Sequence, residues 1–304
     1  MFKQANQSSP CAVIVSYEPD VAVLLALVKQ IGAQADFILV DNASSNAADF
    51  LVQVRAAPRC LHAHSLDHNI GLAAAMNIGL KEATATGYGF AVLFDQDSQV
   101  PVSFFADMQK SYLDAERLCS KPVAALGPRI LSPRNNKAMP FKLFSRVFNR
   151  SDRVISGSEK LFHAEFLISS GCLINLTHLS HIGLMRESYF IDNIDLEWCF
   201  RASAKGFSIV GTDRAVLHHS IGVEDDNAWV KAGLIVSHSP LRSYYSTRNR
   251  FALYREAYAP LAWKLRDFPR FLLKTLWLLL FTSRRAEYLG NIRRGLADSG
   301  RLSK

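Results

Sequence analysis

The segment Leu93-Phe94-Asp95-Gln96-Asp97-Ser98 decides both the fold and the chemistry that the sequence predicts. Apolar residues 90–94 lead into it, and this run predicts a buried strand. In an open α/β sheet the carboxyl ends of parallel strands face the ligand crevice, so Asp95 and Asp97 form a candidate site for Mg²⁺ or Mn²⁺. A strand that ends in a polar turn is the alternative, because two acids with this spacing often occur by chance.

The N-terminal half alternates strands with helices. Residues 11–15 and 37–40 predict strands, and the helix between them follows the capping residue Asp20. A β-α-β unit with short loops predicts a parallel sheet in a Rossmann-like α/β fold, although no G-x-G-x-x-G follows the first strand. Tyr17 and Asp41 lie just past the strand ends, where an aromatic ring can stack on a base and an acid can accept hydrogen bonds. Each, taken singly, is more often an ordinary loop residue.

An alanine-rich helix is predicted after the turn Asn69-Ile70-Gly71, and it continues past Asn77. Small residues let such a helix pack close to a neighbour or a ligand, and its N-terminus would favour an anionic phosphate. A tightly packed core helix is the alternative.

Composition excludes several classes of protein. The chain has 304 residues, of which 49% are hydrophobic and 20% charged, so a large core is expected and a disordered chain is excluded. The five cysteines are scattered, which favours reduced thiols over a disulfide framework. Residues 1–10 are polar and lack the apolar core of a signal peptide, so we expect a site that faces the cytoplasm.

Positive charge is concentrated at the C-terminal end. From Pro240 onward there are 14 Lys and Arg residues against four Asp and Glu residues, a surplus of +10, whereas the whole chain carries +8. The apolar segment Phe271–Thr282 lies within this region and is shorter than the roughly 20 residues that a spanning helix needs. Two interpretations stay open, an interfacial helix on an anionic membrane and a helix docked on the larger domain. The predicted division is an α/β domain at residues 1–225 and a helical extension at residues 226–304.

Four motifs follow one another at matching spacing: V-S-Y at Tyr17, V-D-N-x-S at Asp41, N-x-G-x-A-x-x-x-N from Asn69, and D-Q-D from Asp95. Together they resemble the family 2 glycosyltransferases of the GT-A fold, in their dTDP-rhamnosyltransferase branch, from about residue 11 to beyond residue 250. The pattern Tyr244-Tyr245-x-x-Arg248-Asn249 resembles a further motif of that family. The resemblance implies an inverting enzyme that moves L-rhamnose from dTDP-L-rhamnose to a hydroxyl of a cell-surface glycan or a lipid-linked oligosaccharide.

The resemblance also implies the residues of the site. The nucleotide-sugar donor would contact Tyr17, Asp41, Asn69, Gly71, Asn77 and Asp95. The Mg²⁺ or Mn²⁺ ion would be held by Asp97, with Asp95 and His219 as further ligands. A single histidine is usually structural, but here His218 and His219 follow a predicted strand in a segment similar to the family's H-S-x-G.

A second acidic segment, D-N-I-D at residues 192–195, precedes a predicted helix. Glu197 and Arg201 can form an i,i+4 pair, and acids suit the start of a helix, which is a purely structural interpretation. In the family, the corresponding acids begin a helix and supply the general base. Alignment on Arg201 favours Asp195 as that base, and Asp192 is the second candidate because isoleucine occupies the position before Asp195.

Two other classes of function stay open on the sequence alone. A basic nucleic-acid-binding protein would use the C-terminal cations and would need neither the acids nor a metal, whereas a nucleotidyltransferase would also use paired acids with Mg²⁺. We expect instead an enzyme without a nucleic-acid partner, bound to an anionic membrane surface and therefore peripheral on the inner face of the cell membrane.

Overall fold

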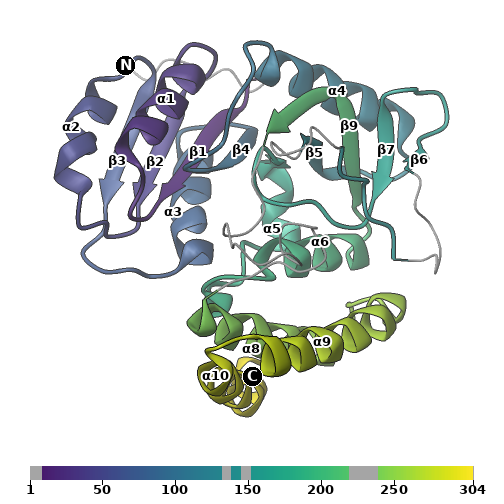
Figure 1. Cartoon of the computed structure of the whole chain (residues 1–304). Helices are drawn as coiled ribbons and strands as arrows, with labels where there is room; N and C mark the ends of the chain where they lie inside the picture. The colour runs from purple at the N-terminus through teal and green to yellow at the C-terminus, as the bar shows by residue number, and fades with distance from the viewer. Residues whose placement is uncertain (1–8, 132–137, 145–151, 219–238, 304) are drawn as a thin grey trace.

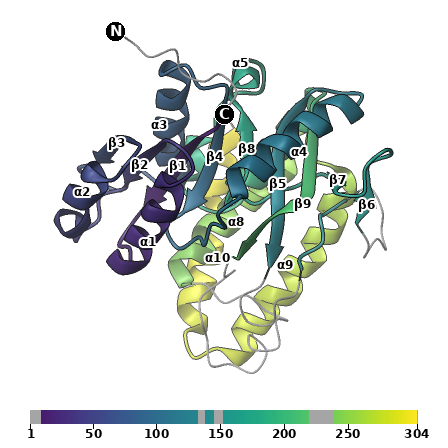
Figure 2. The ribbon, with the colours of Figure 1, turned by 90° about the horizontal axis from the view of Figure 1, so that it is seen from above.

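The computed structural model describes residues 9–131, 138–144, 152–218 and 239–303. Within them, a nine-stranded mixed sheet has the strand order β3-β2-β1-β4-β8-β5-β9-β7-β6 (Figures 1 and 2). The strands are β1 (Cys11–Ser16), β2 (Phe37–Asp41), β3 (Cys60–Ser65), β4 (Phe90–Asp95), β5 (Val123–Leu131), β6 (Arg153–Val154), β7 (Leu161–Ala164), β8 (Leu173–Asn175) and β9 (Ser208–His218).

Helices cover both faces of this sheet (Figure 1). The α-helices are α1 (Val21–Gly32), α2 (Ala47–Ala56), α3 (Leu72–Ala85), α4 (Phe104–Leu118), α5 (Leu179–Ile182), α6 (Ile194–Ala204), α8 (Pro240–Arg255), α9 (Leu261–Phe281) and α10 (Arg285–Asp298). Short 3₁₀ turns are η1 (Leu176–His178), η2 (Glu187–Tyr189) and η3 (Ser299–Ser303). One buried cluster joins α1, α2 and α4 to the sheet, and a second joins α3, α5 and α6 to its other face.

The N-terminal half has the predicted parallel arrangement. β1 pairs in parallel with β2 and with β4, and β2 pairs in parallel with β3, so the carboxyl ends of these strands lie at one edge. The predicted cap of α1 is present, because Asp20 Oδ1 accepts hydrogen bonds from the amides of Ala22 (2.9 Å) and Val23 (3.2 Å). Local sequence signals therefore specify this half.

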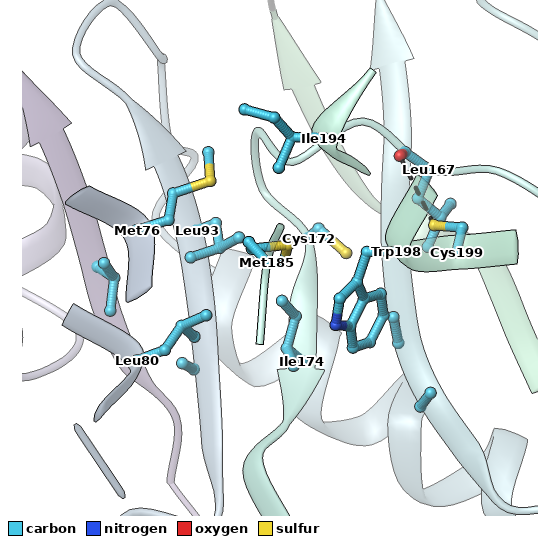
Figure 3. Packing of buried hydrophobic residues seen from close by; sticks show 14 of the residues in the cluster. Met76, Leu80, Leu93, Leu167, Cys172, Ile174, Met185, Ile194, Trp198 and Cys199 are labelled. Atoms are coloured by element: carbon cyan, nitrogen blue, oxygen red, sulfur yellow. Dashed lines mark hydrogen bonds between the residues drawn. The ribbon is translucent and has the colours of Figure 1, made fainter. Parts of the chain in front are cut away.

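The second half of the sheet is mixed. β8 runs antiparallel between β4 and β5, and β9 then pairs in parallel with β5. At the upstream end of β8, the Gly171 amide donates to Leu93 O (2.7 Å) and the Leu93 amide donates to Cys172 O (3.0 Å). Figure 3 shows how Leu93 and Cys172 lie in the same buried layer as Trp198 of α6. This layer brings the end of β4 and the start of α6 together.

The C-terminal helices pack against the face that carries α5 and α6 (Figure 1). Phe200 of α6 joins a small buried cluster with Leu253 and Trp263. One face of α9 is docked, with Phe271 and Leu278 buried, while the leucines of its other face are exposed. The docked-helix interpretation therefore describes one face of α9, and the interpretation as a membrane-surface helix stays a prediction.

Two further expectations concern this region. None of the helices in the described ranges is long and apolar enough to cross a membrane. The predicted boundary between residues 225 and 226 lies outside the described residues, so the division into two domains stays a prediction.

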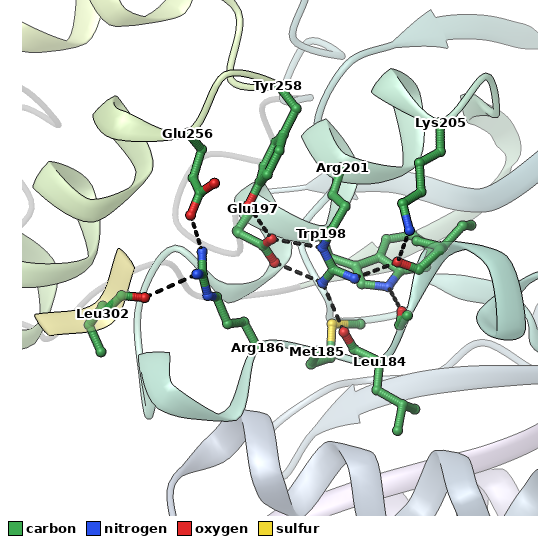
Figure 4. A network of polar contacts seen from close by, with 12 residues as sticks. Leu184, Met185, Arg186, Glu197, Trp198, Arg201, Lys205, Glu256, Tyr258 and Leu302 are labelled. Atoms are coloured by element: carbon green, nitrogen blue, oxygen red, sulfur yellow. Dashed lines mark hydrogen bonds and ion pairs between the residues drawn. The ribbon is translucent and has the colours of Figure 1, made fainter. Parts of the chain in front are cut away.

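A buried ion pair ties α6 to the C-terminal region (Figure 4). Glu197 is 1% exposed. The guanidinium of Arg201 donates to both of its carboxylate oxygens, from Nε at 2.8 Å and from Nη2 at 2.9 Å, which confirms the predicted i,i+4 pair. The Tyr258 hydroxyl donates to the same carboxylate at 2.6 Å. This third bond is one that a helical pattern cannot predict, because it comes from a residue 61 positions away.

Candidate active site

The turn after β4 is connected to three neighbouring segments. The Tyr17 amide donates to Gln96 Oε1 (2.7 Å), and the hydroxyls of Ser98 and Ser170 are hydrogen-bonded at 2.8 Å. Gln99 pairs with His218, the last residue of β9, through an isolated bridge. The structure thus brings the ends of β1, β4 and β9 to the turn that contains the two predicted metal ligands.

Asp195 lies in the first turn of α6, close enough to the turn after β4 for the charge of Asp95 to act on its carboxyl group. Its carboxylate accepts hydrogen bonds from the amides of Leu196 (3.0 Å, to Oδ1) and Ser169 (3.3 Å, to Oδ2). Burial raises the pKa of Asp195 to about 6, the two amides oppose that rise, and the nearby charge of Asp95 adds to it. The carboxyl group can therefore take up and release a proton close to neutral pH.

Asp192, the second candidate base, is held by an ion pair. Its Oδ1 accepts from Nε (3.0 Å) and Nη2 (2.9 Å) of Arg242, and its Oδ2 accepts from Nε at 3.2 Å. Arg242 belongs to α8, which is 50 residues further along the chain. Geometry therefore separates the two acids, since Asp195 is held by backbone amides and Asp192 by a cation.

The loop that leads into α6 has an unusual backbone. Phe190, Asp192 and Asn193 have φ values of +62°, +68° and +61°, although none of them is glycine. Such left-handed residues cost on the order of 1–3 kcal/mol each and persist only where the surroundings hold them. The loop therefore needs bonds from elsewhere in the molecule.

Asn249 of α8 supplies these bonds. Its side chain is fully buried, and its amide nitrogen donates to the carbonyl oxygens of Tyr189 (2.8 Å), Ile191 (2.8 Å) and Asp192 (2.9 Å). The two amide protons are thus shared among three acceptors. The guanidinium of its neighbour Arg248 donates to Ser188 O at 2.7 Å and to Tyr189 O at 3.1 Å. We call residues 188–193 the catalytic loop, because they lead into the start of α6, where the candidate base Asp195 lies.

The resemblance marked Arg248 and Asn249 as part of a motif, but no pattern in the sequence indicates what they contact. A polar residue on an otherwise buried helix face is the signal that could have singled out Asn249. Tyr245 of the same motif stacks on Phe190, with ring centroids 4.8 Å apart and an angle of 13°. The motif therefore positions the catalytic loop.

The residues that are predicted to bind the nucleotide-sugar donor differ in their exposure to solvent. Tyr17 is 48% exposed, so its ring is free to stack on a ligand. Asp41 is fully buried, and its carboxylate accepts from the hydroxyls of Ser16 (2.9 Å) and Ser44 (2.5 Å) and from the Ser44 amide (2.9 Å). Asp41 thus fixes the turn after β2, and Ser44 in turn accepts a hydrogen bond from the Glu18 amide at 2.8 Å.

The turn that contains Asn69 and Gly71 packs directly on the catalytic loop. Asn69 Oδ1 accepts from Nδ2 of Asn42 (3.0 Å) and from the Gly71 amide (2.9 Å). Gly71 has a φ of +88°, and a Cβ there would lie 2.5 Å from the ring of Phe190. Only glycine fits this position, because any side chain would displace the catalytic loop.

Asn77 is in a different environment. It is 1% exposed, and its side chain both donates to Met185 O (2.8 Å) and accepts from the Met185 amide (2.9 Å). A further bond from its Nδ2 reaches Glu187 Oε1 at 2.9 Å. The surroundings of Asn77 fit the alternative interpretation of α3 as a tightly packed core helix. The Asn77 amide is occupied in anchoring the chain ahead of the catalytic loop. His219, the predicted third metal ligand, lies outside the described residues.

The family model for glycosyl transferase family 2 matches residues 11–170, which is more than half of the chain. The chain belongs to glycosyl transferase family 2. It is 28% identical over 279 residues to the dTDP-rhamnosyl transferase RfbF of Shigella flexneri, a match that covers 91% of this chain and 90% of that protein.

Solved structures show the same fold. S. aureus TarS 1–349 in complex with UDP-GlcNAc has a TM-score of 0.56 at 13% identity, covering 97% of this chain and 82% of that chain. The mannosyltransferase PcManGT from Pyrobaculum calidifontis, in complex with GDP-Man and Mn²⁺, has a TM-score of 0.55 at 13% identity, covering 96% and 75%. The fold is therefore of the predicted GT-A type, and these comparisons give no support to a non-catalytic nucleic-acid-binding protein or a nucleotidyltransferase.

The contacts of Asn249 lead to a test. We expect Asn249→Ala to lower kcat by about 10²-fold, because three carbonyls lose their donor and a misplacement of about 1 Å at a site has a cost of this size. Thermal unfolding should also occur at a lower temperature. Transfer kinetics and thermal denaturation measure both effects.

Asn291→Ala is the matched control for this variant. Asn291 lies on α10, and its side-chain amide donates to Glu287 O at 3.0 Å within its own helix, away from residues 188–193. Wild-type kcat and thermal stability in Asn249→Ala would contradict the role assigned to the amide.

Proposed function

We propose that the protein transfers L-rhamnose from dTDP-L-rhamnose to an acceptor hydroxyl with inversion at the anomeric carbon. The observation that carries the reaction is Asp195, held by two backbone amides with a pKa of about 6 beside the Asp95-Gln96-Asp97 turn. Similarity to a dTDP-rhamnosyl transferase along 91% of the chain supports the choice of donor.

The donor nucleotide would lie over the carboxyl ends of β1 and β2. The exposed ring of Tyr17 is available to stack on the base. Asp41 acts through the turn that it fixes, since its oxygens already accept from Ser16 and Ser44. Asn69 and Gly71 shape the adjacent wall through their contacts with Asn42 and the catalytic loop.

The residues after β4 fit a divalent cation. Asp97 is exposed and Asp95 half-buried, and carboxylate oxygens are the ligands that Mg²⁺ and Mn²⁺ prefer. A cation held there supplies charge neutralisation for the departing diphosphate. His219 remains a proposed additional ligand on the strength of the resemblance alone.

Asp195 is the proposed general base. Its carboxylate takes the proton of the acceptor hydroxyl as that oxygen attacks the anomeric carbon, on the face opposite to the leaving nucleoside diphosphate. A pKa of about 6 suits this task, because the group is ionised at neutral pH and still basic enough to accept a proton. Asp192 positions the loop through its ion pair with Arg242.

A donor screen tests the function. We expect slow hydrolysis of dTDP-L-rhamnose in preference to UDP- and GDP-sugars, and loss of that activity in EDTA with recovery on addition of Mg²⁺ or Mn²⁺. Asp97→Asn should lose the activity and keep the fold, since the exposed turn tolerates an isostere. Undiminished turnover in EDTA would contradict the metal site, and preference for another nucleotide would contradict the donor.

The pH profile tests the base. Because the pKa of Asp195 is raised to about 6, log(kcat/KM) for transfer should fall with a slope of one below that pH and level off above it. Asp195→Asn should lower kcat at pH 7.5 by about 10²-fold or more while dTDP binding, measured by calorimetry, stays unchanged.

Asp192→Asn is the comparison variant for this experiment. It should keep the acid limb of the profile and mainly raise the acceptor KM. An inactive Asp192→Asn beside a nearly normal Asp195→Asn would reverse the assignment of the base.

The C-terminal helices support an acceptor at a membrane surface. Large apolar side chains of α9 are exposed, namely Leu261, Leu265, Phe268, Leu272, Leu273, Leu276, Leu280 and Phe281. The arginines that follow it, Arg284, Arg285, Arg293 and Arg294, are exposed. Exposed apolar groups followed along the chain by exposed cations suit a surface of anionic lipid.

The inner side of the same helix borders the site. Lys274 of α9 has its pKa lowered to about 8, first by burial and then by the charge of Arg250, while the nearby charge of Asp192 opposes that shift. A helix that would contact lipid with one face, and that lies near Asp192 with the other, favours a lipid-linked oligosaccharide as acceptor. The enzyme would then be peripheral on the inner face of the cell membrane.

Vesicle binding tests this surface. The protein should sediment with anionic vesicles, bind neutral vesicles weakly, and dissociate with added salt, because each cation near the surface contributes about 1 kcal/mol of screened attraction. The double substitution Leu273→Glu/Leu276→Glu should weaken binding at least about tenfold. Leu113→Glu is the control, since Leu113 is 51% exposed on α4, on the opposite side of the molecule (Figure 1). Equal binding to neutral and anionic vesicles at low salt would contradict the proposal.

A further inference from the structure

A cluster of side chains of the types that bind metals lies between β3 and α3. His62 and His64 project from β3 with their rings nearly parallel, 6.0 Å apart at an angle of 10°. Both reach one carboxylate, that of Glu82 on α3: His62 Nδ1 lies 3.1 Å from Oε1, and His64 Nε2 contacts Oε2. One nitrogen or oxygen from each residue lies within 4.8 Å of the others.

From this geometry we propose that His62, His64 and Glu82 form a second metal site, for Zn²⁺ or a similar borderline-soft divalent cation. Two imidazoles and a carboxylate are a ligand set that Zn²⁺ uses in proteins, and three protein ligands leave one tetrahedral position for water. Imidazole suits Zn²⁺, Ni²⁺ and Cu²⁺ better than Mg²⁺ or Mn²⁺. Ligand chemistry alone thus distinguishes this site from the carboxylates after β4.

An ordinary ion pair explains this arrangement less well. Exposed ion pairs contribute little to stability, and the side chains of His62 and His64 are 52% and 36% exposed. Glu82 can also satisfy only part of the hydrogen-bonding capacity of two imidazoles. A cation bound between the three side chains would be coordinated by all of them at the same time.

The proposed metal site and the candidate active site use different residues. His62 pairs with Ile38 and His64 with Val40, so both lie within β3, and His64 directly precedes Ser65, the partner of Asp41. Glu82 lies near the C-terminal end of α3, whereas Gly71 precedes the N-terminus of that helix. None of the three proposed metal ligands is therefore among the candidate donor-binding or catalytic residues.

A bound cation would fasten an edge strand to the helix that supports the catalytic loop. β3 is the terminal strand of the sheet. α3 carries Asn77, which anchors the chain ahead of the catalytic loop. Metal binding here would stabilise this side of the fold and is independent of the proposed function.

Zinc titration of the full-length protein in the presence of excess Mg²⁺ tests the site. We expect one Zn²⁺ per chain by calorimetry, and binding weakened by at least about 10- to 100-fold in His64→Ala and in Glu82→Gln. His181→Ala is the control, because His181 is exposed on α5 and contacts Ser180. Thermal unfolding without metal checks that each variant is folded, and Glu82→Gln keeps the shape of the side chain.

Hydrogen exchange provides the second measurement. Zn²⁺ should slow exchange of amides in residues 60–65 and 80–85 of the wild type, and should leave these amides unchanged in His64→Ala. Two outcomes would overturn the proposal: absence of Zn²⁺ binding by the wild type, or equal affinity and stoichiometry in wild type and His64→Ala, which would assign the binding to other residues.

Discussion

The rest of the site depends on one side-chain amide, that of Asn249, which holds three carbonyl groups of a backbone that would not otherwise keep its shape. Three residues of that loop are left-handed without being glycine, at a cost on the order of 1–3 kcal/mol each. The same loop presents Asp192 to Arg242 and packs Phe190 against the turn at Gly71. This one short loop therefore fixes three parts of the site relative to one another: the turn at Gly71, the ion pair between Asp192 and Arg242, and the start of α6.

The apolar layer under this loop also has a chemical consequence. Cys172, Trp198 and Cys199 are buried close to the start of α6 (Figure 3). Burial raises the pKa of the Cys199 thiol to about 12 and that of Cys172 well above its usual range, so both sulfurs stay neutral and act as small apolar groups. This apolar wall contributes to the burial that raises the pKa of Asp195. The packing of the core and the acidity of the site thus have a common physical cause.

The sequence predicted those parts of the molecule that local signals determine. The strands up to Asp95 follow from apolar runs, and the cap at Asp20 and the pair formed by Glu197 follow from spacing along a helix. Contacts across long separations could not be predicted in this way. The bonds of Asn249 and the ion pair of Arg242 join residues 50 or more positions apart, and no pattern along the chain indicates them. Asn77 illustrates the reverse case, because a motif marked it as a ligand contact while its amide is occupied within the fold.

The separation between the catalytic loop and its support has a consequence for the order of events during synthesis. Asn249 follows Ile191 by 58 residues, and ribosomes add roughly 5–20 residues each second. The donor side and the loop itself are therefore synthesised roughly 3 to 12 seconds before Asn249. A nascent chain can build most of the fold in that interval, yet it cannot hold the left-handed segment. Competence for transfer therefore depends on the synthesis and docking of α8.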